Sequence, residues 1–182
     1  GGYKLEKAIK EFHLDLKNLV MADIGASTGG FTDCALQNGI AKVYAIDVGT
    51  NQLDWKLRTN PHVINLEKTN IKQVTEDMIG EKVDFISTDI SFISVLKILP
   101  AVHSILKPEG SVVILIKPQF EVGLGVKRNK KGVVTDAKAV NLAMKRFEVL
   151  ASSLKFELIA CKECEVKGKE GNAEFFYAFN KR

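Results

Sequence analysis

Long apolar runs, paired cysteines and a strong charge imbalance are all absent from this sequence, and each absence excludes a class of protein. The longest apolar stretches, such as residues 112–116, are far too short to span a bilayer, and no charged-then-apolar signal peptide opens the chain. We therefore expect no membrane partner. The three cysteines are too few for a disulfide framework, which favours a reducing, cytoplasmic location. The net charge of +4 is compatible with a polyanionic partner but does not require one.

The cysteines also do not provide a complete set of metal ligands. Cys161 and Cys164 have the spacing of a zinc knuckle, but no second pair follows, and none of the three histidines lies near them in sequence to complete four ligands. A redox pair should open a helix after a strand, whereas this pair lies inside a strand-like run. We predict no metal site.

The length of 182 residues and the 46% hydrophobic content fit one globular domain, predicted over residues 1–182. Apolar residues at helical spacing from Tyr3 to Leu16 predict an amphipathic N-terminal helix in the segment 1–18, followed by the core of the domain at 19–182. Because the chain begins at Gly1-Gly2 without a methionine, we expect it to be a fragment that lacks an N-terminal segment.

Apolar runs bounded by glycine and polar residues predict strands that alternate with helices, which is typical of a parallel sheet covered on both faces. The glycine-rich segment 167–172 between the last two runs suits an antiparallel hairpin. The sequence therefore predicts an α/β fold with a mostly parallel seven-stranded sheet and a C-terminal antiparallel strand. The predicted strands are 19–24, 42–46, 62–66, 82–87, 111–116, 156–166 and 173–179, and the predicted helical segments after the first are 29–38, 52–57, 94–106 and 136–153.

A glycine-rich loop, Asp23-Ile24-Gly25-Ala26-Ser27-Thr28-Gly29-Gly30, follows the first predicted strand. The first strand-helix turn is the usual ligand anchor of a doubly wound sheet, and its glycines allow the backbone to approach a ligand closely. Asp47 closes the second strand, where an acidic residue binds the ribose hydroxyls of an adenine nucleoside. The loop therefore predicts a nucleoside-containing ligand, although an ordinary turn flanked by strand-end acids remains the simpler interpretation.

Three ligands compete for such a loop. A phosphate-binding P-loop would continue with lysine, but here Phe31 precedes Thr32. A dinucleotide loop would have a glycine in place of Ser27, and Asp23 would repel a pyrophosphate. The carboxylate of Asp23 suits the ammonium of S-adenosylmethionine (SAM), which also has a ribose and no phosphate. SAM is therefore the favoured ligand, and NAD is the alternative.

Asp89 and Lys117 each close an apolar strand at the same predicted edge of the sheet. With these residues and the loop, the sequence resembles the TlyA (hemolysin A) family of ribosomal RNA 2′-O-ribose methyltransferases, whose catalytic domain is similar to FtsJ-type enzymes. The resemblance covers essentially the whole chain. It rests on the segments 1–8, 23–32, 47–49, 52–53, 66–70, 89–94, 117–121 and 171–174.

The resemblance implies a Rossmann-like SAM-dependent methyltransferase fold and a catalytic tetrad of Lys4, Asp89, Lys117 and Glu174. A ribose 2′-hydroxyl is a very weak acid, so its attack on the methyl group of SAM needs a base and a positive environment for the developing alkoxide. We predict that Lys117 is the base and that Asp89 orients it. Glu174 is expected to hold Lys4 or the ribose in place.

The resemblance also implies a cofactor site around the glycine loop. Asp23 and Gly25 are expected near the methionine moiety, Asp47 on the ribose and Asn70 near the adenine, with Glu67 as a weaker candidate for the adenine site. The predicted cofactor-binding residues are Asp23, Gly25, Ala26, Ser27, Thr28, Gly29, Asp47, Val48, Asn70 and Asp89.

Ribosomal RNA or a ribosomal subunit is the expected partner. Phosphate contacts are predicted from Lys7, Lys127, Arg128, Lys130 and Lys131, with Lys10 on the same rim, although a solvated mobile loop would also explain the run 127–131. Members of the family usually carry an N-terminal S4 RNA-binding domain, which is absent here. The alternative function is an RNA-binding or haemolysis-associated protein whose cofactor site is vestigial.

Overall fold

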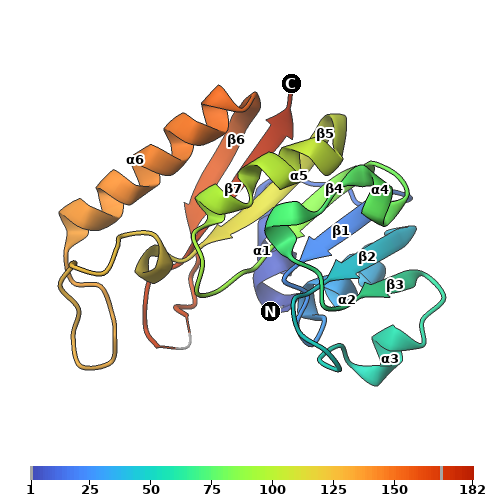
Figure 1. Ribbon diagram of the computed structural model, residues 1–182, viewed down its shortest axis with the longest axis horizontal. Helices are drawn as coiled ribbons and strands as arrows, with labels where there is room; N and C mark the ends of the chain where they lie inside the picture. The colour runs from blue at the N-terminus through green and yellow to red at the C-terminus, as the bar shows by residue number, and fades with distance from the viewer. Residues whose placement is uncertain (1, 169) are drawn as a thin grey trace.

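The computed structural model describes residues 2–168 and 170–182 of the chain. Gly1, the first residue of the predicted domain and of the segment 1–8, and Lys169, in the predicted hairpin loop 167–172, lie outside the described residues. The chain forms one twisted sheet with helices on both faces (Figure 1).

The sheet has seven strands in the order β3-β2-β1-β4-β5-β7-β6. Strands β1 to β5 pair in parallel, and β7 pairs antiparallel with both β5 and β6. The predicted α/β class, with a mostly parallel seven-stranded sheet and an antiparallel C-terminal strand, is confirmed. The strands are β1 (Val20–Ile24), β2 (Lys42–Ile46), β3 (Val63–Leu66), β4 (Val83–Thr88), β5 (Leu106–Ile116), β6 (Phe156–Glu163) and β7 (Phe175–Lys181).

Two helical layers cover the sheet because successive strand residues point to opposite faces. In β5, Val112 and Ile114 pack toward helices α5 (Leu99–Ile105) and α6 (Ala137–Ser153). The alternate residues Val113 and Leu115 pack toward helices α1 (Gly2–Glu11) and α2 (Gly30–Gln37). The shorter helical segments are α3 (Trp55–Arg58), α4 (Glu76–Ile79), and the 3₁₀ turns η1 (Ile71–Gln73), η2 (Val95–Lys97) and η3 (Pro118–Phe120).

Two predicted helices differ from the structure. The first ends at Glu11 instead of residue 18, because His13 has a left-handed backbone with φ of 53° that a helix cannot include. The prediction of one helix over 94–106 is also wrong: it divides into η2 and α5, and Leu106 already belongs to β5. Leu106 pairs with Val83, and a register shift separates this pair from the next.

The loops that follow the parallel strands gather at their carboxyl ends, together with the loop between β6 and β7 (Figure 1). This edge is the ligand-binding side of an open parallel sheet. In the parts of the chain that the structure describes, no helix combines the length and the apolar composition that crossing a bilayer requires.

Candidate active site

The glycine loop between β1 and α2 turns sharply across the end of β2. Gly25, Ser27 and Gly29 have φ values of 79°, 52° and 100°. The backbone N–H groups of Gly25 and Ala26 donate to the carbonyl oxygen of Ile46 at 2.9 and 3.1 Å. Gly25 is also pressed against the loop after β4, since a Cβ atom at this position would lie 2.2 Å from the carbonyl oxygen of Asp89. No side chain larger than hydrogen fits there.

Asp23 is fully buried beneath this loop. Its carboxylate accepts hydrogen bonds from the hydroxyls of Thr32 at 2.7 Å and Ser87 at 3.4 Å. Burial raises the pKa of the Asp23 carboxyl to about 7, against the lowering effect of the Thr32 hydrogen bond, and the nearby charge of Asp89 raises it further. Asp23 and Asp89 line a cavity of about 210 Å³ with residues of the glycine loop. A cationic group in this cavity would compensate the buried carboxylate.

Asp47 holds the loop in shape from the end of β2. Its carboxylate accepts the backbone N–H groups of Ser27 at 2.7 Å and Gly49 at 3.0 Å. A carboxylate has about four lone-pair sites, so Asp47 keeps acceptor capacity for a ligand hydroxyl. The predicted cofactor residues thus separate into two groups. Asp23, Gly25, Ala26, Ser27, Thr28 and Asp89 line the 210 Å³ cavity, whereas Gly29, Asp47, Val48 and Asn70 do not.

The two adenine-site candidates already have partners. The side chain of Asn70 accepts the backbone N–H of Lys72 at 3.1 Å and so caps η1. Glu67 forms an ion pair with Arg58 at 2.6 Å and accepts the side-chain amide of Asn65. These hydrogen bonds to Glu67, that from Arg58 first, hold the pKa of its carboxyl below the ordinary value. Glu67 therefore has a structural partner that the sequence does not indicate.

The four residues of the predicted tetrad form two ion pairs. Lys117, after β5, places its ammonium 2.5 Å from Oδ1 of Asp89, after β4, and donates a hydrogen bond to Oγ of Ser91 at 3.0 Å. Lys4 of α1 donates to Oε1 of Glu174 at 2.5 Å. The side chains of Lys117 and Glu174 are 14% and 5% exposed, so both pairs are largely shielded from water.

Cys164 lies next to the Lys4–Glu174 pair. Its backbone N–H donates to the carbonyl oxygen of Glu174 at 2.8 Å. Burial raises the pKa of its thiol to about 11; Lys4 lowers it, while Glu174 and, among smaller effects, Asp89 raise it further. Charges from both pairs therefore influence the pKa of the Cys164 thiol. The same thiol pKa makes Cys164 a poor nucleophile at neutral pH.

The basic run 127–131 forms a short, braced turn. Arg128 and Val134 make an isolated antiparallel bridge, and the side chain of Asn129 accepts the N–H groups of Lys131 at 2.8 Å and Val133 at 3.0 Å. The guanidinium of Arg128 also donates to the carbonyl of Gly123. We call residues 127–134 the basic hairpin. Its Lys127, Lys130 and Lys131 side chains are exposed.

Asn172 ties the basic hairpin to the loop that carries Glu174. Its side chain is buried, accepts the N–H of Val134 at 2.9 Å and donates to the carbonyl of Gly132 at 3.4 Å. Asn172 lies two positions before Glu174 in the chain. The loop between β6 and β7 therefore contacts the basic hairpin through Asn172 and Lys4 through Glu174.

Two lysines of α1 have acidic neighbours, and only one of the two pairs lies within the helix. Lys7 forms an ion pair with Glu165, and Lys10 lies 3.8 Å from Glu6. The expected basic rim along α1 is thus interrupted by carboxylates. Glu6 lies one turn before Lys10 on α1 itself, whereas Glu165 comes from the segment after β6.

Three residues at the site were not predicted from the sequence. Ser91 contacts the Lys117 ammonium, Asn172 supports the basic hairpin, and Phe92 is 87% exposed with φ of 70°. Phe92 stacks at a tilt on Phe120, with 5.2 Å between ring centroids. Their position in the sequence could have indicated them, because all three lie within the segments 89–94 and 171–174, on which the family resemblance rests. An exposed aromatic ring beside Asp89 offers a surface for a planar group.

Within residues 2–168 and 170–182, no group of three histidine, cysteine, aspartate or glutamate side chains could hold a metal ion. Cys161 is an exposed residue and Cys164 a half-buried one, and both are free thiols.

The comparisons with known proteins agree over nearly the whole chain. The family described as FtsJ-like methyltransferase matches residues 1–181. YqxC of Bacillus subtilis (strain 168), described as an rRNA methyltransferase, is 44% identical over 176 residues, which cover 96% of this chain and 62% of YqxC. The 23S rRNA (cytidine-2′-O)-methyltransferase TlyA of Campylobacter jejuni is 40% identical over 178 residues, which cover 98% of this chain and 68% of that protein.

A solved structure from Streptococcus thermophilus, described as a hemolysin, superposes with a TM-score of 0.94 at 42% identity. The match covers all of this chain and 66% of that one. The chain thus spans a little under two thirds of the length of YqxC and of the Streptococcus thermophilus protein.

Proposed function

The chain belongs to the FtsJ-like methyltransferase family, and we propose that it transfers the methyl group of SAM to a ribose 2′-hydroxyl of ribosomal RNA. The proposal is carried by two shielded ion pairs, Lys117–Asp89 and Lys4–Glu174, and by Asp89, which also lines the glycine-loop cavity. Residues 1–182 would form a single methyltransferase domain. A ribosomal substrate would place the protein in the cytoplasm.

The residues of the glycine loop fit SAM. The buried carboxylate of Asp23 is suited to the ammonium of the methionine moiety, and the close turn at Gly25 allows the backbone to approach the ligand. Asp47 retains acceptor positions for the ribose hydroxyls. Asn70 would contact the adenine through its amide group, while its oxygen caps η1. When bound, SAM supplies a methyl group on a positively charged sulfur.

The tetrad residues would prepare the ribose hydroxyl for attack. Lys117 donates to Ser91 and pairs with Asp89, which leaves the third direction at its Nζ for the substrate hydroxyl. We propose that Lys117, in its neutral form, takes the hydroxyl proton and that Asp89 fixes its position. The ammonium of Lys4, held by Glu174, would stabilise the negative charge that develops on the ribose oxygen.

We propose that ribosomal RNA or a ribosomal subunit is bound through the basic hairpin, with Lys127, Arg128, Lys130 and Lys131 on phosphates. Lys7 would join them by exchanging its partner Glu165 for a phosphate. The portion of the relatives that this chain does not match leaves room for the expected N-terminal S4 domain, which would add further contacts.

The proposed function is tested by transfer of a labelled methyl group from SAM to ribosomal subunits, followed by mapping of the modified nucleotide. We expect label on a ribose 2′-oxygen. Label on a base would contradict the proposed chemistry. If the full-length protein neither transferred a methyl group to any ribosomal RNA nor bound SAM, the RNA-binding protein with a vestigial cofactor site would be favoured.

Replacing Gly25 by alanine is expected to weaken SAM binding at least tenfold, because the new Cβ atom would collide with the backbone of Asp89 and displace the loop. Isothermal titration calorimetry measures this change. Gly80→Ala is the matched control, since Gly80 also has a positive φ of 102° but no atom within 4 Å of its Cβ position. Equal SAM affinity in the two variants would contradict the proposed role of the loop.

Replacing Asn172 by alanine is expected to raise the KM for RNA about tenfold, because losing both hydrogen bonds frees the basic hairpin from its support. The affinity for SAM should stay unchanged, since Asn172 does not line the glycine-loop cavity. Asn60→Ala, at an exposed turn before β3, serves as the control. An unchanged KM with faster hydrogen exchange at residues 127–134 would show that the hairpin does not bind RNA.

A further inference from the structure

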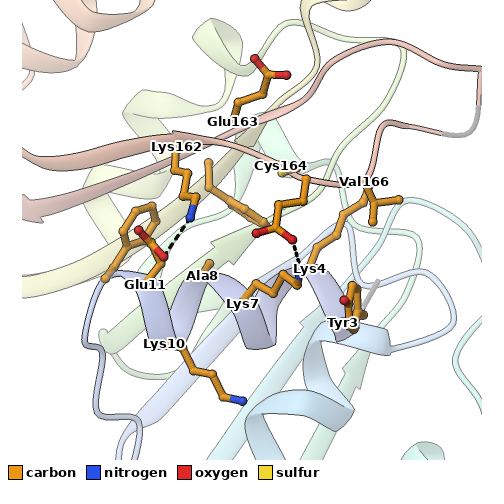
Figure 2. Close-up of a pocket in the computed structure, with 13 residues that line it drawn as sticks. Tyr3, Lys4, Lys7, Ala8, Lys10, Glu11, Lys162, Glu163, Cys164 and Val166 are labelled. Carbon is orange, nitrogen blue, oxygen red and sulfur yellow. Dashed lines mark hydrogen bonds and ion pairs between the residues drawn. The ribbon is translucent and has the colours of Figure 1, made fainter.

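A second cavity, of about 230 Å³, lies between α1 and the segment 162–166 that ends β6 (Figure 2). Its lining includes Ala8 of α1, Phe176 of β7 and Cys164. Ala8 and Phe176 are each only 4% exposed, so they form an apolar floor. Tyr3 and Val166 lie together at one end of the cavity (Figure 2). The cofactor site proposed above uses none of this space.

The cavity is continuous with the proposed catalytic site. Lys4 lines the cavity, and its ammonium bonds the carboxylate of Glu174. Cys164 also lines the cavity and donates its backbone N–H to the carbonyl oxygen of Glu174. A ribose held at Lys4 would therefore lie beside the cavity. The part of the RNA closest to the cavity would then be the adjoining nucleotide of the same strand.

Lysine side chains form the walls of the cavity. Lys7 pairs with Glu165 and Lys162 pairs with Glu11 at 2.9 Å, each pair crossing from one wall to the other. The four side chains are 40% to 62% exposed, and ion pairs this exposed contribute little stability. Their ammonium groups can therefore pass to a phosphate. Figure 2 shows Lys10 and Glu163 pointing away from the space between α1 and β6.

We propose that this cavity is a subsite for the nucleotide next to the methylated one, with its base over the apolar floor and its phosphate on Lys7 and Lys162. The inference rests on the proposed function and adds a second RNA position to it. Sequence-specific RNA recognition commonly uses unstacked bases packed on aromatic side chains, and Tyr3, which is 62% exposed, provides such a ring. An apolar side chain of a ribosomal protein is the competing occupant, but it would make no interaction with the ammonium groups of Lys7 and Lys162.

The test fills the cavity without removing a charge. Ala8→Phe places a ring over the floor, and Ala41→Phe puts the same change at an exposed position before β2. With ribosomal subunits and with protein-free ribosomal RNA as substrates, we expect Ala8→Phe to raise the KM for RNA at least about tenfold, while its SAM affinity matches that of Ala41→Phe.

A KM equal to that of Ala41→Phe would overturn the proposal, and so would a defect on subunits with normal transfer to protein-free RNA, which would indicate a ribosomal protein side chain. Should Ala8→Phe fail to fold, the wild-type chain is titrated with an RNA tetranucleotide and followed by NMR. Shifts at the amides of Ala8, Cys164 and Phe176 are expected, and their absence would reject the subsite. This titration needs no methyl transfer, so it separates failure of the subsite from failure of the proposed function.

Discussion

Lys117→Ala is expected to lower the rate of methyl transfer by about 10²- to 10⁴-fold, the usual contribution of a general base. The variant removes the group that joins Asp89 to Ser91 at the carboxyl end of β5. It should bind SAM normally, because Lys117 does not line the glycine-loop cavity. Single-turnover transfer with saturating SAM measures the chemical step directly.

Lys117→Arg separates the base from a purely electrostatic role. Arginine can replace the positive charge beside Asp89, but it stays protonated at neutral pH and cannot accept the hydroxyl proton. Loss of transfer as complete as in Lys117→Ala would support the base. A rate within about fivefold of wild type would instead assign Lys117 to charge stabilisation alone and remove it as the base.

The stability of the ligand-free protein is expected to fall between about pH 4 and pH 7 because of Asp23. The ordinary pKa of this carboxyl is 3.8, and burial raises the pKa in the folded state to about 7. A group whose pKa is higher in the folded state makes its full contribution to the free energy of unfolding below the pKa of the unfolded state. This contribution is lost as the pH rises through the pKa of the folded state. Three pH units correspond to a loss on the order of 4 kcal/mol.

Asp23→Asn isolates this contribution, since the amide keeps the shape of the side chain and cannot ionise. Urea unfolding of both proteins from pH 4 to pH 8 should show a difference that grows with pH in favour of the variant. Other carboxyls, such as Glu81, whose pKa the Lys42 hydrogen bond lowers, act equally in both proteins and cancel. Parallel curves for the two proteins would mean that Asp23 is already charged when folded.

The same carboxyl links SAM binding to pH. If the ammonium of SAM pairs with ionised Asp23, binding below pH 7 must release the proton that Asp23 carries. We expect an affinity that is constant above pH 7 and falls about tenfold per pH unit below it. Calorimetry in buffers of different ionisation enthalpy measures the released proton directly, and Asp23→Asn should release none.

The sheet could be predicted from the sequence because its buried strands are continuous apolar runs that end at polar residues. For the same reason Asp89 and Lys117, which end two neighbouring strands, could be placed at one edge. Lys4 and Glu174 are 170 positions apart, and only the family resemblance brought them together before the structure did.

Contacts between distant loops could not be predicted. Glu165 pairs with Lys7, and Asn172 bonds the basic hairpin, because the chain after β6 folds back over α1 and over residues 132–134. The end of the helix predicted at 94–106 coincides with the pairing of Leu106 with Val83, which is also a tertiary contact. Local periodicity contains no information about these contacts.

The position of β7 between β5 and β6 has a consequence for synthesis of the chain. β6 precedes β7 in the chain, so β5 lacks a neighbour on that side of the sheet until residues 175–181 have been synthesised. The Lys4–Glu174 pair joins residues 170 positions apart, and such non-local contacts form late in folding. A nascent chain can therefore complete its glycine loop long before Glu174 is available to pair with Lys4.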